Sequence, residues 1–434
     1  MKQLTRLFIP ICLETLFYML SGMVDTLMLS AVGDYAVGAV GTANSYIGIF
    51  IIMFSIISSG MVSVMTQNIG AGRPGVAYQA RQLGLLFNAV AGVLMAVFLF
   101  SGAGAILRMV GIADALYEPA LIYLKIVGGG CILNAVIPIF SSYLRAFGYT
   151  KQPLYATIVG NIANFVMNAV FLFVLHKGVA GVATATVISK ILNLCIVLYF
   201  SHKLISAKNS TERIANKTVL GQIVKVGLPS ACETALYNVA MMLVIRFLNQ
   251  MDAEGLNVTA RSYTATISNF SYCVGAALAQ ANAIMTGWHI GAGELEECDR
   301  GTKRAAFVGV CVAVCMETAI VLSSGFIMPL FTDNPEMTAL VRKLLAIDIV
   351  LEIGRVTNLV FGQALKTSGD AVFPAVIAAV FMFVFAVGGT WLFGISMGLM
   401  AVGAYIGLAS DECVRAVGMV WRWKTGKWRT KKLV

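Results

Sequence analysis

The sequence predicts an all-α integral membrane protein of twelve transmembrane helices, arranged as two parallel six-helix repeats. Three observations support this fold class. The 434-residue chain is 59% hydrophobic and only 12% charged, whereas soluble proteins carry about 25% charged residues. Apolar runs of about 20 residues recur along the chain, and each can cross a bilayer core of roughly 30 Å. Several short motifs also return, in the same order, about 220 residues later.

The repeated motifs define a duplicated unit. The matching pairs are Pro10–Tyr18 with Pro229–Tyr237, Ile69–Gly72 with Ile290–Gly293, Leu144–Pro153 with Leu365–Pro374 and, more loosely, Gly178–Val182 with Gly398–Val402. Ordered matches at one spacing in a hydrophobic chain are typical of a transporter with two lobes and a substrate path between them.

Each expected span is an apolar run, and because backbone groups in lipid must be satisfied within the segment, each is expected to be a helix. The spans are residues 7–29, 40–65, 83–107, 119–143, 154–175, 178–201, 222–249, 261–287, 304–330, 339–364, 374–394 and 398–420. The predicted domains are an N-lobe (1–201), a cytoplasmic linker (202–221), a C-lobe (222–420) and a basic, Trp-rich cytoplasmic tail (421–434).

Basic residues concentrate in alternate loops and in the tail, whereas the opposite loops hold only Arg108, Lys177, Arg261, Arg342 and Lys343. This asymmetry predicts a multi-pass protein of the cell inner (plasma) membrane with both termini in the cytoplasm. Two halves of six spans enter from the same side, so the repeat is parallel, with a pseudo-twofold axis along the membrane normal. The net charge of +10 therefore reflects membrane orientation and not a nucleic-acid partner. The tail is expected to anchor on anionic lipid.

Enzymatic and ATP-driven functions find no support in the motifs. The nine cysteines are scattered and are expected to fill the core. The three histidines lie apart, and no metalloprotease, Walker or clustered-aspartate motif occurs in the sequence. We expect a non-enzyme without a cofactor, driven by an ion gradient.

Ionisable and amide side chains within the N-lobe spans are candidate functional residues, because they are costly in lipid. Glu14 and Asp25 lie on one side of the first span. Asn161, Asn164 and Asn168 share one face of the fifth span. Such a row of amides either forms hydrogen bonds between helices or supplies carbonyl ligands beside a carboxylate. The second environment suits Na⁺ and would also shift the pKa of a protonatable Asp.

Lys190 and Thr186 add to this cluster from the sixth span. Lys190 is expected either to neutralise an acid of its lobe, such as Asp25, or to bind carbonyl groups independently. The repeat offsets place Val244 in the C-lobe at the position of Asp25, so the cluster is not duplicated.

The C-lobe carries its own charges. Glu352 and Arg355 are one helical turn apart, as are Asp411 and Arg415, so structural ion pairs are expected. Glu233 has no partner one turn away within its span, which favours a functional role. The predicted substrate-cavity residues are Glu14, Lys190, Glu233, Asp348, Glu352, Arg355 and Asp411.

The ordered motifs resemble the multidrug and toxic compound extrusion (MATE) family over essentially the whole chain. They are Val24-Asp25-Thr26-Leu-Met-Leu, Asn68-Ile-Gly-Ala-Gly72, Leu144-Arg-Ala-Phe-Gly148, Asn164-Phe-Val-Met-Asn168 and Gly178-Val-Ala-Gly-Val-Ala-Thr-Ala-Thr186. The resemblance implies export of organic cations and other amphipathic compounds in exchange for H⁺ or Na⁺, by alternating access of the two lobes.

The resemblance also implies a cation site. Asp25 matches the family's aspartate of the first span, Asn164 and Asn168 its pair in the fifth, and Thr186 its threonine in the sixth. One branch has an aspartate where this chain has Asn168. No metal other than Na⁺ at these four residues is expected. A sodium-linked branch carries acids in spans 7 and 10, and near the latter this chain has Arg355.

Two alternatives stay open. A lipid-linked oligosaccharide flippase of the same superfamily would need more basic cavity residues to bind pyrophosphate. A membrane transferase would need clustered acids at the membrane surface, for which Glu294–Asp299 is the candidate. The expected partners are small cationic or amphipathic molecules and membrane lipid, and we expect a monomer.

Overall fold

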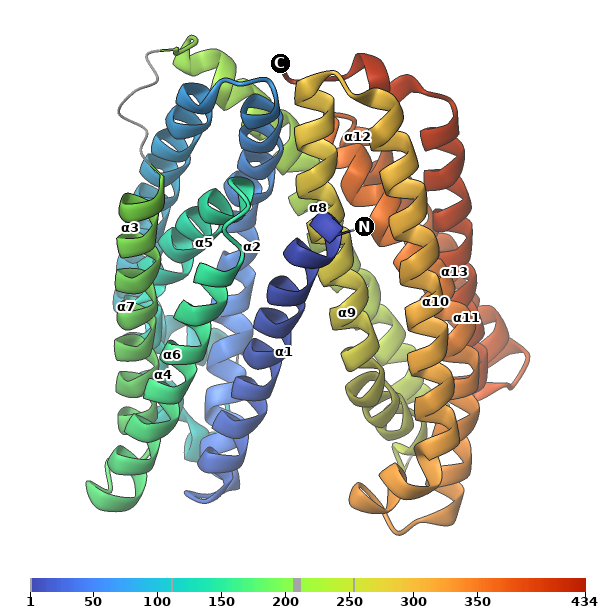
Figure 1. Cartoon of the computed structure of the whole chain (residues 1–434). Coiled ribbons are helices and arrows are strands. Elements are labelled where there is room, and N and C mark those ends of the chain that lie inside the picture. The colour runs from blue at the N-terminus through green and yellow to red at the C-terminus, as the bar shows by residue number, and fades with distance from the viewer. Residues whose placement is uncertain (1, 111, 206–211, 253) are drawn as a thin grey trace. The chain divides into compact units, whose positions relative to one another are not determined.

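The computed structural model describes residues 2–110, 112–205, 212–252 and 254–434. These ranges are helical, with short connections and no β-strand. The chain divides into two compact units, unit 1 (Met1–Gly227) and unit 2 (Leu228–Val434). Figure 1 shows long helices in each unit.

Unit 1 contains the first six spans and the start of the seventh. Its elements are α1 (Lys2–Ser30), α2 (Asp34–Gly70), α3 (Pro74–Val110), α4 (Asp114–Gly129), α5 (Cys131–Ala146), α6 (Lys151–Ala169) with the π-helical turn η1 (Val170–Val174), and α7 (Gly178–Leu204). Unit 2 contains the rest of α8 (Asn216–Met251), α9 (Leu256–Ala292), α10 (Leu295–Ile327) with η3 (Met328–Leu330), α11 (Pro335–Thr367), α12 (Val372–Phe381) with the π-helical η4 (Met382–Val387) and η5 (Thr390–Ser396), α13 (Met400–Lys424) and η6 (Lys427–Thr430).

The expected twelve spans are present in the described residues, once α4 and α5 are joined as one bent span. By length and composition, eight helices are apolar enough to cross a membrane, and the α4–α5 pair makes a ninth. The other three are α9, α11 and α13, which are long enough but more polar. Buried polar side chains such as Asn282, Glu352 and Asp411 lower their hydropathy.

The fourth span differs from the straight helix that its apolar run predicts. α4 and α5 meet at Gly130 with a bend of 41°. The break contains three consecutive glycines, Gly128, Gly129 and Gly130. Because glycine has a low helix propensity, interrupting the helix here costs little free energy. Asn134 therefore lies in the first turn of α5.

The junction between the units lies inside α8. The predicted linker 202–221 overlaps helix at both ends, because α7 continues to Leu204 and α8 begins at Asn216. Residues 206–211 of that linker fall outside the described residues. Gln79 of α3 connects the start of α8 to the rest of unit 1, because it donates to the carbonyl of Ile214, just before α8, over 2.7 Å and to Asn216 Oδ1 in the first turn of α8.

The tail departs from a simple lipid anchor. Trp423 and Trp428 are each 1% exposed and stack with ring centroids 4.2 Å apart. The Trp423 indole donates to Asp299, and Arg422 forms an ion pair with the buried Asp370. Only Trp421 of these tail tryptophans is exposed. The tail is therefore packed into unit 2, because its indoles find hydrogen-bond acceptors within the protein.

Candidate functional site

The predicted carboxylate and amides of unit 1 meet between α1 and α6. The Asn168 side chain donates to Asp25 Oδ1 over 2.8 Å and to Asn164 Oδ1 over 3.1 Å. Asn168 is fully buried, Asn164 is buried and Asp25 is half-buried. The Asn168 carbonyl oxygen is buried without a hydrogen-bond partner. The cluster therefore offers a carboxylate and a spare amide oxygen to a cation.

Local sequence explains this placement. Asn164 and Asn168 are four residues apart on α6 and so share a face. Asp25 lies within α1, which continues to Ser30, so it is not a helix cap. Asn161 of the same row of amides donates to the carbonyl of Phe17 over 3.0 Å. This third amide joins α6 to α1 and is not part of the carboxylate cluster.

Thr186 is connected to the cluster by way of Tyr123, which lies near both Thr186 and Asp25. The Thr186 hydroxyl donates to the Val182 carbonyl over 2.9 Å, as expected for a helical threonine. The Thr186 side chain also lies beside the buried Tyr123 hydroxyl, which faces Asn44 and lies in the field of Asp25. Sequence reasoning missed Tyr123 and Asn44. Their only signal was that each is a polar residue in an apolar run.

Lys190 does not form an ion pair with Asp25. Its ammonium donates to Asn134 Oδ1 over 2.8 Å, beside Cys131 at the bend of the fourth span. Of the two alternatives for Lys190, the structure favours independent binding of a carbonyl group over a direct ion pair with Asp25. The charge of Lys190 still acts on Asp25 at longer range.

Glu14 and Glu233 are both paired. Arg145 donates to Glu14 Oε1 over 2.6 Å, and Lys366 lies 2.8 Å from Glu233 Oε2. Glu233 has no partner within its own helix, but α11 supplies Lys366. These contacts favour a structural role for both acids over a role in the cavity.

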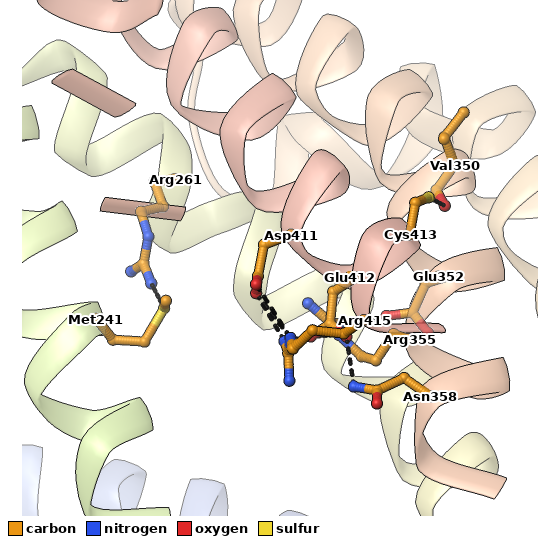
Figure 2. A network of polar contacts seen from close by, with 10 residues as sticks. All are labelled: Met241, Arg261, Val350, Glu352, Arg355, Asn358, Asp411, Glu412, Cys413 and Arg415. Carbon is orange, nitrogen blue, oxygen red and sulfur yellow. Dashed lines mark hydrogen bonds and ion pairs between the residues drawn. The ribbon is translucent and has the colours of Figure 1, made fainter. Parts of the chain in front are cut away.

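A group of charged side chains on α11 and α13 forms one connected network (Figure 2): Glu352, Arg355, Asp411, Glu412 and Arg415. Glu352 pairs with Arg355, and Asp411 accepts hydrogen bonds from both Nε and Nη2 of Arg415, as the spacing predicted. Glu412 joins the two pairs, since it lies 2.7 Å from Arg415 and 3.8 Å from Arg355.

A cavity of about 270 Å³ within unit 2 opens onto this network. Its charged and aromatic lining includes Tyr237, Arg261, Tyr272, Asp348, Arg355 and Asp411. The predicted cavity residues Asp348, Arg355 and Asp411 thus lie together, whereas Glu14 and Lys190 belong to unit 1.

Comparison with known proteins identifies relatives over the whole chain. The MatE family model matches residues 10–170 and again 229–392, which confirms the internal duplication. The chain is 32% identical over 428 residues to the uncharacterized transporter YisQ of Bacillus subtilis (strain 168), covering 97% of this chain and 94% of YisQ. It is 20% identical over 446 residues to the probable multidrug resistance protein NorM of Thermotoga maritima, covering 100% and 94%.

Solved structures share the fold. A crystal structure of MATE in the straight conformation matches with a TM-score of 0.87 and 22% identity, over 99% of this chain and 97% of that one. A variant of the Vibrio cholerae MATE transporter VcmN matches with a TM-score of 0.89 and 17% identity, over 99% and 98%. The two matches of the family model and the full-length similarity to YisQ show that this chain is a transporter of the MatE family.

Proposed function

We propose that this transporter exports organic cations or amphipathic compounds in exchange for H⁺ or Na⁺. The observation that carries the proposal is the contact of Asp25 with Asn168 and, through it, Asn164. A carboxylate in a membrane helix is costly unless it binds a proton or a cation during the cycle. The amide oxygens beside it are ligands that Na⁺ accepts.

The proposed cycle uses this site as the coupling element. The ion binds Asp25 with oxygens of Asn164, Asn168 and Thr186. Binding replaces the hydrogen bond from Asn168 to Asp25 and so changes the contact between α1 and α6. Transport by alternating access then requires only that the ion and the substrate prefer different states of the protein.

The remaining parts of the proposal follow from composition and family. The protein works in the plasma membrane as a monomer with both termini in the cytoplasm, and its partners are its substrates and lipid. It needs no cofactor besides the coupling ion. Labelling of single cysteines introduced near each terminus, in intact and in opened cells, tests the orientation.

The coupling site is tested by uptake of a fluorescent organic cation into proteoliposomes under separate Na⁺ and H⁺ gradients. Asp25→Asn removes the charge at nearly constant size, and we expect it to abolish gradient-driven transport while the protein stays folded. Asp114→Asn, the same change at an exposed position, is the matched control and should transport normally. Undiminished coupled transport by Asp25→Asn would reject the assignment.

A further inference from the structure

A second hollow in unit 2, the α10–α11 groove, has a volume of about 790 Å³ and shares no residue with the cavity beside the charged network. It lies where α10 ends and α11 begins. On its α11 wall, Ala339 lies one helical turn before Lys343, and Arg342 one turn before Ala346. Because alanine side chains are short, they leave space beside the two bases. Asp333, in the connection between the helices, also lines the groove.

The charged side chains of the groove are not paired with one another. Arg342, Lys343 and Asp333 are exposed, and their side chains form no ion pair or hydrogen bond within the described part of the chain. The start of α11 does not supply free amides either, because Asn334 accepts hydrogen bonds from two of its backbone N–H groups over 2.9 and 3.2 Å. An anion in the groove would therefore be bound by the two bases. Two bases and a separate acid match a ligand that carries both a negative and a positive group.

The groove adjoins a surface that faces lipid. α10 with η3 forms one apolar span that ends at Leu330, which places the groove near the boundary of the membrane. Leu322, Phe326 and Leu330 follow one another at a spacing of four residues, and they are 72%, 87% and 83% exposed. Val321, next to Leu322, lines the groove itself. An exposed apolar stripe on a membrane helix is suited to contact acyl chains, so a lipid can reach the groove with its headgroup.

Membrane orientation does not account for the two bases. Arg342 and Lys343 belong to the set of loops that holds few basic residues, where the positive-inside rule gives no reason for them. A basic pocket between membrane helices is, in contrast, typical of a site for a lipid headgroup. We propose that the α10–α11 groove binds phosphatidylethanolamine, whose headgroup joins a phosphate to a primary amine.

Each part of this lipid has a matching part of the groove. Arg342 and Lys343 donate charge-assisted hydrogen bonds to the phosphate, and Asp333 accepts a hydrogen bond from the ammonium group. The acid distinguishes between phospholipids. Phosphatidylglycerol offers it no cation, and the trimethylated amine of phosphatidylcholine has no N–H group to donate.

The test measures lipid binding to the purified full-length protein by native mass spectrometry. Phosphatidylethanolamine, phosphatidylglycerol and phosphatidylcholine with the same acyl chains are titrated separately, and inorganic phosphate is a further arm that distinguishes a lipid site from a phosphate site. We expect phosphatidylethanolamine to bind roughly 10-fold more tightly than the other two lipids. The readout is binding and not transport, so the result does not depend on the coupling site at Asp25.

Substitutions separate the two halves of the headgroup. Arg342→Gln combined with Lys343→Gln should weaken binding of all three lipids by roughly 10-fold, because each carries the phosphate. Asp333→Asn should remove the preference for phosphatidylethanolamine and leave phosphatidylcholine binding unchanged. Lys177→Gln and Asp114→Asn, the same changes at exposed positions of unit 1, are the matched controls and should bind as wild type does.

The substituted groove residues are exposed, so we expect these variants to fold, and melting temperatures check this. The proposal is overturned if the three lipids bind equally, if the double variant binds phosphatidylethanolamine as wild type does, or if Asp333→Asn retains the preference. It is also overturned if inorganic phosphate binds as tightly as the lipid.

Discussion

Arg145 contacts Glu14 over 2.6 Å, and the same contact recurs in the other half of the chain between Lys366 and Glu233 over 2.8 Å. The acids are repeat-equivalent, and so are the bases. Each pair joins the first span of its unit to the end of the fourth, α1 to α5 and α8 to α11. Each unit therefore has its own copy of this ion pair between its first and fourth spans. The amide cluster, in contrast, occurs in unit 1 and is not repeated at the equivalent positions of unit 2.

Breaking this pair should destabilise the protein. Glu14→Gln removes the ion pair between Glu14 and the Arg145 guanidinium, which is only 17% exposed. We expect a loss of about 3 kcal/mol in the free energy of unfolding. Melting temperatures in detergent micelles measure it, and Glu233→Gln should behave alike. Glu118→Gln, an exposed acid of α4, is the control. Equal stability of all three variants would contradict a structural role for the pair.

Asn168 should set the affinity of the coupling cation. Asn168→Leu removes both the hydrogen bond to Asp25 and the free amide oxygen, so we expect roughly 10-fold weaker cation activation of transport. Asn168→Asp adds a second negative charge beside Asp25, which should strengthen cation activation. Transport rates at graded Na⁺ and H⁺ concentrations test both variants. A change in the same direction in both would count against Asn168 as a ligand.

The sequence was sufficient for features that depend on local spacing. Apolar runs predicted all twelve spans, and the helices extend beyond those runs, as α1 does from Lys2 to Ser30, because hydropathy marks only the lipid core. The pairs of Glu352 with Arg355 and Asp411 with Arg415 follow from their positions one turn apart.

Contacts between distant segments were not predictable in this way. Lys190 binds Asn134, and Glu233 binds Lys366, because the packing of other helices decides which partner is nearest. The bend at Gly130 that brings Asn134 into reach had a local signal in three adjacent glycines. Tyr123, beside Thr186, had no periodic signal.

Close packing of α13 should be sensitive to a single methyl group. A Cβ on Gly403 would lie 2.4 Å from the carbonyl carbon of Phe393 in η5. Because the obstacle is backbone, Gly403→Ala must separate the helices, with an expected loss of about 2 kcal/mol. Gly325→Ala, in α10 with open space around it, should instead be neutral or stabilising by up to about 1 kcal/mol. Thermal unfolding compares them, and a stable Gly403→Ala protein would refute the predicted clash.

Asp252 should make the start of α9 sensitive to acid. Its slight burial acts to raise the pKa, but hydrogen bonds from Asn257 and from the backbone of Leu256 and Gly255 outweigh burial, so the pKa lies below the usual value. A depressed carboxylate pKa stabilises the folded state above about pH 4 and loses that effect as pH falls through the folded value. We therefore expect Asp252→Ala to lower the free energy of unfolding at neutral pH by about 1 kcal/mol. The melting temperature at neutral pH should fall accordingly. The difference from wild type should shrink below about pH 4. A pH-independent difference would exclude this mechanism.

The tail offers a comparison between two tryptophans seven residues apart. Trp428 is 1% exposed, stacks on Trp423 and donates to its carbonyl over 3.1 Å, whereas Trp421 is 58% exposed. Trp428→Ala should leave a cavity and cost about 3 kcal/mol. Trp421→Ala should change stability by less than about 1 kcal/mol, because its indole contributes little to the core. Melting temperatures and protease resistance of the C-terminus measure both. If the tail served only as a lipid anchor, the order would reverse: Trp421→Ala would weaken binding to anionic vesicles, and Trp428→Ala would leave stability unchanged.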